Sequence, residues 1–337
     1  MTHRIFGAVT LTAVVGMTAV AQERTVSLSA SAWEGTDSVR AEAYLGRPSL
    51  YINRGVALAR DVELENGTIE YDVAATARTS FLGLAFRATS PRFSEVILIR
   101  PRQSGTIEAL QYAPAFNNVA AAWQIYHGPE SNAAVTIPRE RWVHVRVELA
   151  GPTARIFFDT ATAPTLTVPR LAGAGGRRFG VWTGAFGRGA YFSNIRYTLS
   201  SMPVSTAGAA RPEPGIIRNW ELSNAIEPAP FTPASLPDLT KLTWERVTAE
   251  PAGFVLVNRY REQPNGGVPV DPTTHAVLVD SVMTGKVAGS RIVYARTSIE
   301  SPRSEIRRLQ YSYSDGVVIY LNGRPLALAM NPQGLRD

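Results

Sequence analysis

The chain has 337 residues, which is long enough for two domains, and it is 45% hydrophobic and 18% charged. This composition excludes a disordered chain, because it supplies ample apolar material for packed cores. There is no cysteine, so disulfides and thiolate metal sites are also excluded. The net charge is +6, but the basic residues are spread singly along the chain and form no basic stripe. We therefore expect no nucleic-acid partner.

The first 21 residues have the order of a signal peptide. His3-Arg4 is a short basic region, residues 5–17 are almost wholly apolar, and Ala19-Val-Ala21 is a small-x-small cleavage site. The alternative is a membrane anchor, but the apolar run is shorter than the ~20 residues that a full span needs. We predict cleavage after Ala21, a periplasmic or secreted protein, and no transmembrane segment after removal of the signal.

Residues 22–199 are dominated by a hydrophobic period of two. The clearest runs lie at residues 68–73, 95–100, 143–149 and 154–159, and each is bounded by Gly, Pro, Asn or Asp. Short strands of this kind, without long helical patterns between them, are typical of a sandwich or barrel. The sequence therefore predicts an all-β domain over residues 22–199.

A stretch rich in Ser, Ala, Pro and Gly follows, and we interpret residues 200–215 as an interdomain linker. A short helix or strand is expected at residues 216–225. Strands are expected at residues 254–257, 276–279, 292–297, 305–313 and 317–321. Asn322-Gly323 predicts a tight hairpin turn. We expect no clear closing strand after it, so residues 216–337 are interpreted as a second, smaller β domain that is C-terminally incomplete.

Several motifs of the first domain form a recognisable set. Arg141–Glu148 and Arg155–Asp159, joined by a Gly-Pro turn, resemble the W-x-x-V-x-V hairpin of concanavalin A-like sandwiches. These include laminin G-like modules and the domains allied to 3-keto-disaccharide hydrolases. Residues 67–72, 81–87, 179–183 and 190–197 resemble further strands of that family. The resemblance implies a concanavalin A-like jelly-roll sandwich, with Trp142 in its core. That fold hosts lectins, hydrolases and adhesion modules, so it does not imply one activity.

The second half carries a different resemblance. Tyr311–Gly323, with its Y-S-D-x-V-x-V-x-L-N-G pattern, is similar to the galactose-binding-like β-sandwich appended to β-galactosidase-type enzymes. The resemblance implies a second β-sandwich. In that family the ladder continues with further strands beyond the Asn-Gly turn.

Two groups of residues invite a test for catalysis or metal binding. Glu70 and Asp72 alternate on one strand, as the two carboxylates of a retaining glycosidase can, but they equally fit the solvent face of a strand whose Tyr71 faces the core. His144 is expected to point outward beside a core valine. Asp159 and Asn194 are the oxygen donors that a laminin G-like calcium site would use. We assign no catalytic residue, metal or cofactor.

The candidate ligand-binding residues are aromatic and amide side chains expected on neighbouring strands of a concave sheet. Aromatic rings stack on the apolar faces of sugars, and amides pair with their hydroxyls. In the alternative interpretation, Trp123 belongs to the core and only Tyr126 lies on the concave face. The candidates are Gln111, Tyr112, Trp123, Tyr126 and His127. The sequence thus favours a non-catalytic carbohydrate-recognition protein, with a glycoside- or keto-sugar-processing hydrolase and a protein-interaction or adhesion module as alternatives.

Overall fold

A computed structural model of the chain defines the fold. It describes residues 22–35, 39–117, 121–184, 189–200, 215–227, 236, 238–251, 253–262, 291–311, 313 and 315–331. The predicted signal peptide, nearly all of the predicted linker and the strand expected at residues 276–279 lie outside the described residues. In the part that is described, no helix is both long and apolar enough to span a membrane.

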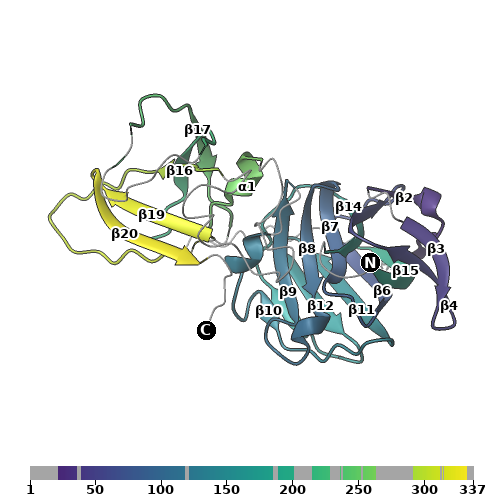
Figure 1. Cartoon of the computed structure of the whole chain (residues 1–337). Helices are drawn as coiled ribbons and strands as arrows, with labels where there is room; N and C mark the ends of the chain where they lie inside the picture. Colours follow the sequence, from purple (N-terminus) through teal and green to yellow (C-terminus); the bar gives the residue numbers. More distant parts are fainter. Residues whose placement is uncertain are drawn as a thin grey trace, which may run out of the picture.

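Residues 23–199 form a sandwich of two antiparallel sheets (Figure 1). The eight-stranded sheet has the order β13 (Leu166–Val168), β12 (Thr153–Phe158), β11 (Trp142–Ala150), β6 (Gly67–Ala75), β15 (Ala190–Leu199), β4 (Arg47–Ile52) and β3 (Val39–Tyr44), with β1 (Glu23–Thr25) paired to β15. The seven-stranded sheet has the order β10 (Asn132–Ala133), β9 (Leu110–Phe116), β8 (Phe93–Ile99), β7 (Leu82–Ser90), β14 (Arg178–Thr183), β5 (Gly55–Ala59) and β2 (Trp33–Glu34). The described residues of the sandwich include three short 3-10 helices between strands: η1 (Ala30–Ala32), η2 (Pro101–Gln103) and η3 (Ala121–Gln124).

The core lies between the two sheets, and side chains of both contribute to it. Tyr71 and Phe192 of the eight-stranded sheet and Phe86 and Phe116 of the seven-stranded sheet belong to one buried cluster. Their exclusion from water is the main favourable contribution to folding. The alternation of the sequence dictates this arrangement, since successive strand residues face opposite sides. The predicted all-β sandwich is confirmed.

One core assignment is wrong. Trp142 was expected in the interior, but it is only half-buried and shares the outer face of β11 with His144. The physical reason is the period of the strand itself. Val143 and Val145 occupy the inward positions, so their neighbours must face outward.

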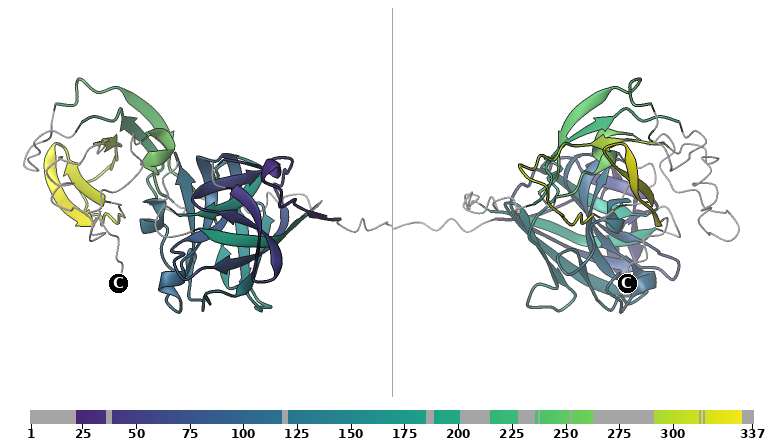
Figure 2. Two further views of the ribbon diagram at one scale, coloured as in Figure 1. Left: turned by 45° about the vertical axis from the view of Figure 1, so that its right-hand side comes forward. Right: turned by 90° about the vertical axis from the view of Figure 1, so that its left-hand side faces the viewer.

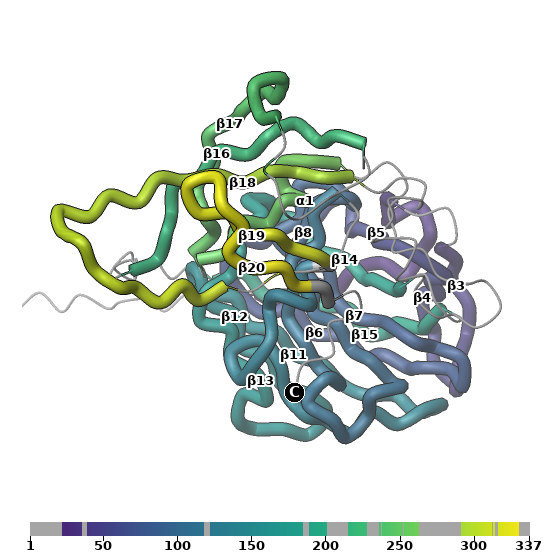
Figure 3. The backbone as a smooth tube through the Cα atoms, turned by 60° about the vertical axis from the view of Figure 1, so that its left-hand side comes forward, coloured from purple at the N-terminus to yellow at the C-terminus, as the bar shows by residue number. Residues whose placement is uncertain are grey.

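The C-terminal strands lie beside the sandwich (Figure 1; Figure 2). A three-stranded sheet has the order β17 (Trp244–Thr248), β16 (Asn219–Ser223) and β18 (Ala295–Arg296), and α1 (Val257–Tyr260) is a single helical turn. A separate two-stranded hairpin consists of β19 (Asp315–Leu321) and β20 (Arg324–Asn331) (Figure 3). Further β structure after residue 215 is confirmed. Its assembly into a galactose-binding-like sandwich stays a prediction.

The hairpin turn forms where the sequence predicts it. Asn322 and Gly323 both have positive φ, 51° and 79°, which suits a two-residue turn between twisted strands. The expectation of no strand after this turn is wrong, because Arg324–Asn331 pairs along β19. Residues 305–311, in contrast, form no strand, although their composition predicted one.

The strand expected at residues 254–257 is also absent, and this segment packs on the sandwich instead. Leu256 is 4% exposed and belongs to the same core cluster as the sheets. The ring of Phe254 meets that of Tyr126 at 5.3 Å, and the guanidinium of Arg259 lies 4.1 Å from the ring centroid of Phe116. We call residues 254–261 the strap. Its apolar residues bury surface that the edge of the sandwich would otherwise expose.

Candidate functional site

The outer face of the eight-stranded sheet carries a row of aromatic side chains that crosses five strands. Trp142 of β11 pairs with Ala74 of β6, which pairs with Tyr191 of β15. Tyr191 in turn pairs with Tyr51 of β4, and Tyr51 with Arg40 of β3. Directly paired residues project from the same side of a sheet. The fold therefore gathers on one face rings that are far apart in the sequence.

A fourth ring joins this row from the last residue of β3, just before the turn to β4. Leu45 and Gly46 both have positive φ, 48° and 74°, and this tight turn directly follows Tyr44. Tyr44 stacks on Tyr191 with ring centroids 3.8 Å apart and meets Trp142 edge-on at 6.2 Å. We call Tyr44, Tyr51, Trp142 and Tyr191 the aromatic cluster.

A pocket of about 320 Å³ opens beside this cluster. Such a volume lies at the small end of the range of ligand sites, which suits one sugar ring. The pocket combines two aromatic rings with charged and small polar side chains. We call it the tyrosine pocket, and its lining residues are Arg40, Tyr51, Thr76, Ala77, Arg78, Glu140 and Tyr191.

Hydrogen bonds fix the loop wall of the tyrosine pocket. The guanidinium of Arg139 donates to the carbonyl oxygens of Thr76, Ala77 and Thr79, at 2.8, 3.0 and 3.2 Å. The hydroxyl of Thr79 donates to the carbonyl of Gly189 at 2.7 Å and accepts from the backbone N–H of Thr76 at 2.9 Å. A wall held in this way is preorganised, so little ordering is needed when a ligand binds.

Electrostatics keep the pocket tyrosine protonated. Burial, followed by its hydrogen bond to Glu42, raises the pKa of Tyr191 to about 12. The pKa of Glu42 is lowered, chiefly by its hydrogen bond with Arg40, whose Nε lies 2.7 Å from Oε2. At neutral pH this wall therefore presents three groups that interact with one another: the phenol of Tyr191, the carboxylate of Glu42 and the guanidinium of Arg40.

Next to the aromatic cluster lies a row of charges centred on His144. Its Nδ1 is 2.9 Å from Oδ1 of Asp72, and its Nε2 is 3.4 Å from Oε2 of Glu70. Arg47 approaches Asp72 at 2.7 Å, and Arg196 pairs with Glu70. Glu70 and Asp72 thus do lie on the outer face, as the alternation of β6 predicted, and His144 points outward as expected.

The environment of Asp72 favours its ionised form. Burial opposes ionisation, but hydrogen bonds from His144 and Asn194, together with the charges of His144 and Arg47, lower the pKa of Asp72 below its ordinary value. A carboxylate that must protonate a leaving group needs a raised pKa instead. Asp72 is therefore suited to holding its neighbours in place and unsuited to acting as a general acid.

The residues predicted to bind a ligand are gathered near β9, but most of them are interior. Gln111, Tyr112 and Tyr126 are 0%, 0% and 3% exposed. Trp123 and His127 are half-buried at the surface. Residues 123–127 were expected to form a strand, but the chain turns through η3, and the N–H of Tyr126 bonds to the carbonyl of Ala122 at 2.8 Å.

Their polar atoms have partners within the protein. The amide of Gln111 donates to the carbonyl of Trp123 at 2.8 Å, and the hydroxyl of Tyr112 bonds to Glu95. His127 Nε2 lies 2.8 Å from a carboxylate oxygen of Glu108. A binding role for these five residues stays a prediction, and only Trp123 and His127 offer surface for it here.

The two residues considered from the sequence as calcium ligands bond to other side chains of the protein. Asp159 bonds to Arg141 at 2.8 Å, whereas Asn194 donates to Asp72. Within the described ranges, no cluster of three or more His, Asp or Glu side chains is arranged to hold a metal ion.

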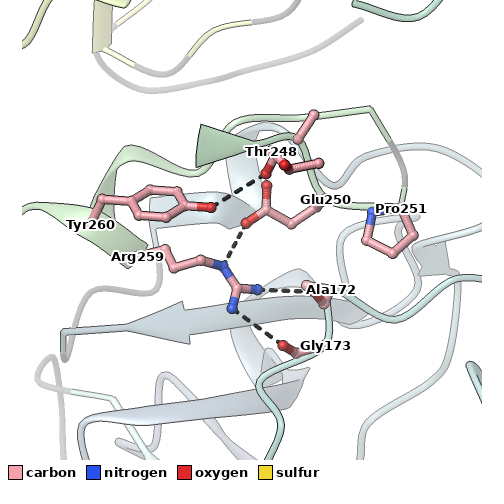
Figure 4. A pocket seen from close by; sticks show the side chains of 8 residues that line it. Ala172, Gly173, Thr248, Glu250, Pro251, Arg259 and Tyr260 are labelled. Atoms are coloured by element: carbon pink, nitrogen blue, oxygen red, sulfur yellow. Dashed lines mark hydrogen bonds and ion pairs between the residues drawn. The ribbon is translucent and has the colours of Figure 1, made fainter. Parts of the chain in front are cut away.

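A second pocket, of about 220 Å³, lies between the sandwich and the strap (Figure 4). Nε of Arg259 donates to Glu250 at 2.6 Å, and its terminal nitrogens donate to the carbonyls of Ala172 and Gly173 at 2.9 and 3.2 Å. Burial raises the pKa of Glu250. These groups satisfy one another, so the arrangement serves to hold the strap on the sandwich. The lining residues are Ala172, Gly173, Thr248, Ala249, Glu250, Pro251, Arg259 and Tyr260.

Comparisons with known proteins give structural matches only. No family model matches the chain, and no curated protein matches it. A carbohydrate-binding module, CBM66 from Bacillus subtilis, aligns with 52% of this chain and 94% of its own at 13% identity and a TM-score of 0.33. A Bacillus subtilis protein with a galectin-like fold aligns over 52% and 94% at 9% identity and 0.38. Domain 4 of a GH43 extracellular arabinanase from Geobacillus stearothermophilus, in complex with arabinotriose, aligns over 53% and 81% at 12% identity and 0.29. At these TM-scores neither the fold nor the function of this chain is inferred from the matches.

Proposed function

We propose that this protein recognises a carbohydrate, and that the tyrosine pocket is its binding site. One observation carries the proposal: Tyr51 and Tyr191 line a pocket together with Arg40, Arg78 and Glu140. A pyranose ring has apolar C–H faces and a rim of hydroxyls. Aromatic rings contact the faces, and charged side chains pair with the hydroxyls through strong hydrogen bonds.

The position of the pocket agrees with this role. It adjoins the aromatic cluster, so a longer saccharide bound in the pocket would extend over Tyr44 toward Trp142. The contact between these two rings, 6.2 Å between centroids, makes a continuous aromatic surface. Each ring contact contributes about 1 kcal/mol, so the affinity should be modest, in the micromolar to millimolar range.

A hydrolase is the second candidate, and one observation favours it. Glu70 and Asp72 flank His144 on the outer face, close to where the saccharide would lie. Both carboxylates, however, are already paired with arginines, Glu70 with Arg196 and Asp72 with Arg47. Recognition without catalysis is therefore the better-supported function. Export of the protein, with removal of residues 1–21, also stays a prediction.

The test is calorimetric titration of the chain from residue 22 onward with a panel of oligosaccharides. Tyr191→Ala should weaken binding by roughly tenfold, the loss of about one ring contact. Tyr311→Ala is the matched control, because Tyr311 is 45% exposed and lies outside the sandwich. Thermal unfolding of both variants checks that the fold survives. If no saccharide in the panel gives a heat of binding, the carbohydrate proposal is wrong and a protein-interaction role is favoured.

A further inference from the structure

The tyrosine pocket contains two charged side chains whose charges are not neutralised. Among the described residues, nothing forms an ion pair or a side-chain hydrogen bond with the guanidinium of Arg78 or with the carboxylate of Glu140. Both are exposed, and both line the same pocket. They are also not within ion-pair distance of each other, so each is available to a ligand.

The neighbouring charges differ in this respect. Arg40 is bound to Glu42, and Arg141 to Asp159 at 2.8 Å. Arg139 donates to three carbonyls and so is committed to the loop wall. Of the described cations that line or adjoin the pocket, Arg78 is thus the one that a ligand can use without breaking an existing contact.

Glu140 and Arg78 pair with different chemical groups of a ligand. Glu140 is an acceptor, and the hydroxyls of any sugar can donate to it. The charge of Glu140 also acts on the aromatic cluster. The pKa of Tyr44 is raised chiefly by burial and, to a smaller extent, by the negative charge of Glu140. Arg78 is a donor with a planar fork, and a carboxylate is the group that matches this fork with two parallel hydrogen bonds. A neutral sugar would satisfy Glu140 but would leave the charge of Arg78 without a counterpart.

We infer that the ligand of the tyrosine pocket is an acidic saccharide whose carboxylate pairs with Arg78 while its hydroxyls donate to Glu140. This inference rests on the proposed function and specifies the class of sugar. The net charge of +6 on the whole chain favours the approach of such a ligand.

The experiment compares ligands that differ in the charge of their carboxyl groups. The full chain from residue 22 is titrated with a galacturonate trisaccharide, with its methyl ester, and with a sulfated neutral trisaccharide. The free acid should bind at least about tenfold more tightly than the ester, and added salt should reduce that difference. Arg78→Gln should abolish the preference, and Glu140→Gln should weaken acid and ester alike.

Arg102→Gln is the matched control, because Arg102 is exposed in η2 of the opposite sheet and does not line the pocket. Equal binding of acid and ester, or an unchanged preference in Arg78→Gln, would overturn the inference while leaving carbohydrate recognition intact. Arg78-dependent binding of the sulfated trisaccharide alone would overturn the carboxylate assignment. If no saccharide binds at all, the proposed function itself fails.

Discussion

His144 and Asp72 face each other across β11 and β6, with Nδ1 of the imidazole 2.9 Å from Oδ1 of the carboxylate. The two residues are 72 positions apart in the chain but directly paired in the sheet. The contact therefore links the outer face of β11 to that of β6, where Arg47 and Asn194 also bind the same carboxylate.

Asp72 should make the stability of the sandwich depend on acid pH. Its pKa in the folded protein lies below the ordinary value of 3.8, so the ionised carboxylate stabilises the fold above that value. This contribution is lost as the pH falls through the folded pKa. Asp72→Asn should therefore be less stable than the wild type at pH 7, and the two should converge below about pH 3.8.

Urea unfolding at a series of pH values measures this difference. Asp61→Asn is the control, because Asp61 is exposed in the loop after β5 and forms no ion pair with any described residue. A gap between wild type and Asp72→Asn that stays constant from pH 7 to pH 2 would contradict the role given to the carboxylate.

Trp142→Ala should cost far less stability than a core substitution. Trp142 is half-buried on the outer face, where it meets Tyr44 and lies 5.5 Å from the guanidinium of Arg47. We expect a loss of about 1–2 kcal/mol with the fold retained. Phe192→Ala, in the fully buried core, should cost about 3–5 kcal/mol. Chemical unfolding of both variants measures the two losses of stability. Equal losses would show that Trp142 contributes to stability as a core residue does.

The strands of the sandwich could be predicted because their hydrophobic period is two and their ends carry turn residues. The outward position of Trp142 was also predictable, since Val143 and Val145 alternate with it. The aromatic cluster was not. Tyr44, Tyr51 and Tyr191 come from three strands, and only their pairing in the sheet brings them together.

At residues 123–127 the prediction failed in the opposite sense, because a strand with surface side chains was expected and is not formed. Their aromatic and polar side chains resemble a binding strand, but a 3-10 turn covers the sheet there and places Tyr126 inside. Local composition does not reveal which aromatic residues a loop covers. That depends on contacts with distant segments, such as the 5.3 Å contact between Tyr126 and Phe254.

Glu95→Gln should destabilise the sandwich. Glu95 is completely buried, and its carboxylate accepts hydrogen bonds from the backbone N–H groups of Gly173 and Ala174 at 2.7 and 2.8 Å. Both of these bonds go to one carboxylate oxygen, whereas the other accepts from the Tyr112 hydroxyl and from the backbone N–H of Ala172 at 3.2 Å. An amide that keeps its oxygen on Gly173 and Ala174 turns its NH₂ group toward the donors of Tyr112 and Ala172, which leaves a buried donor unsatisfied at a cost of about 1–3 kcal/mol. Glu63→Gln is the control, since its side chain is 71% exposed. Unfolding in urea should shift only for Glu95→Gln, and unchanged midpoints for both would contradict the assignment.

Leu256→Ala should destabilise the sandwich even though Leu256 lies far beyond its last strand in the sequence. The side chain is 4% exposed and packs in the core cluster of the two sheets, so its truncation leaves a cavity. The expected loss is about 2–5 kcal/mol. Leu326→Ala, on the exposed side of β20 at 57% exposure, should have almost no effect. Tryptophan fluorescence during chemical unfolding reports mainly on the sandwich, which contains four of the six tryptophans of the chain: Trp33, Trp123, Trp142 and Trp182.

The same contact predicts the outcome of limited proteolysis. The predicted linker, residues 200–215, is the expected site of the first cut, and the strap should then keep the two pieces associated through Leu256 and the bond between Arg259 and Glu250. Co-elution of the two fragments in size-exclusion chromatography measures this association. Leu256→Ala should cause them to separate, whereas Leu326→Ala should not. Immediate separation of the wild-type fragments, with a sandwich as stable as in the intact chain, would show that the strap contributes nothing to the core.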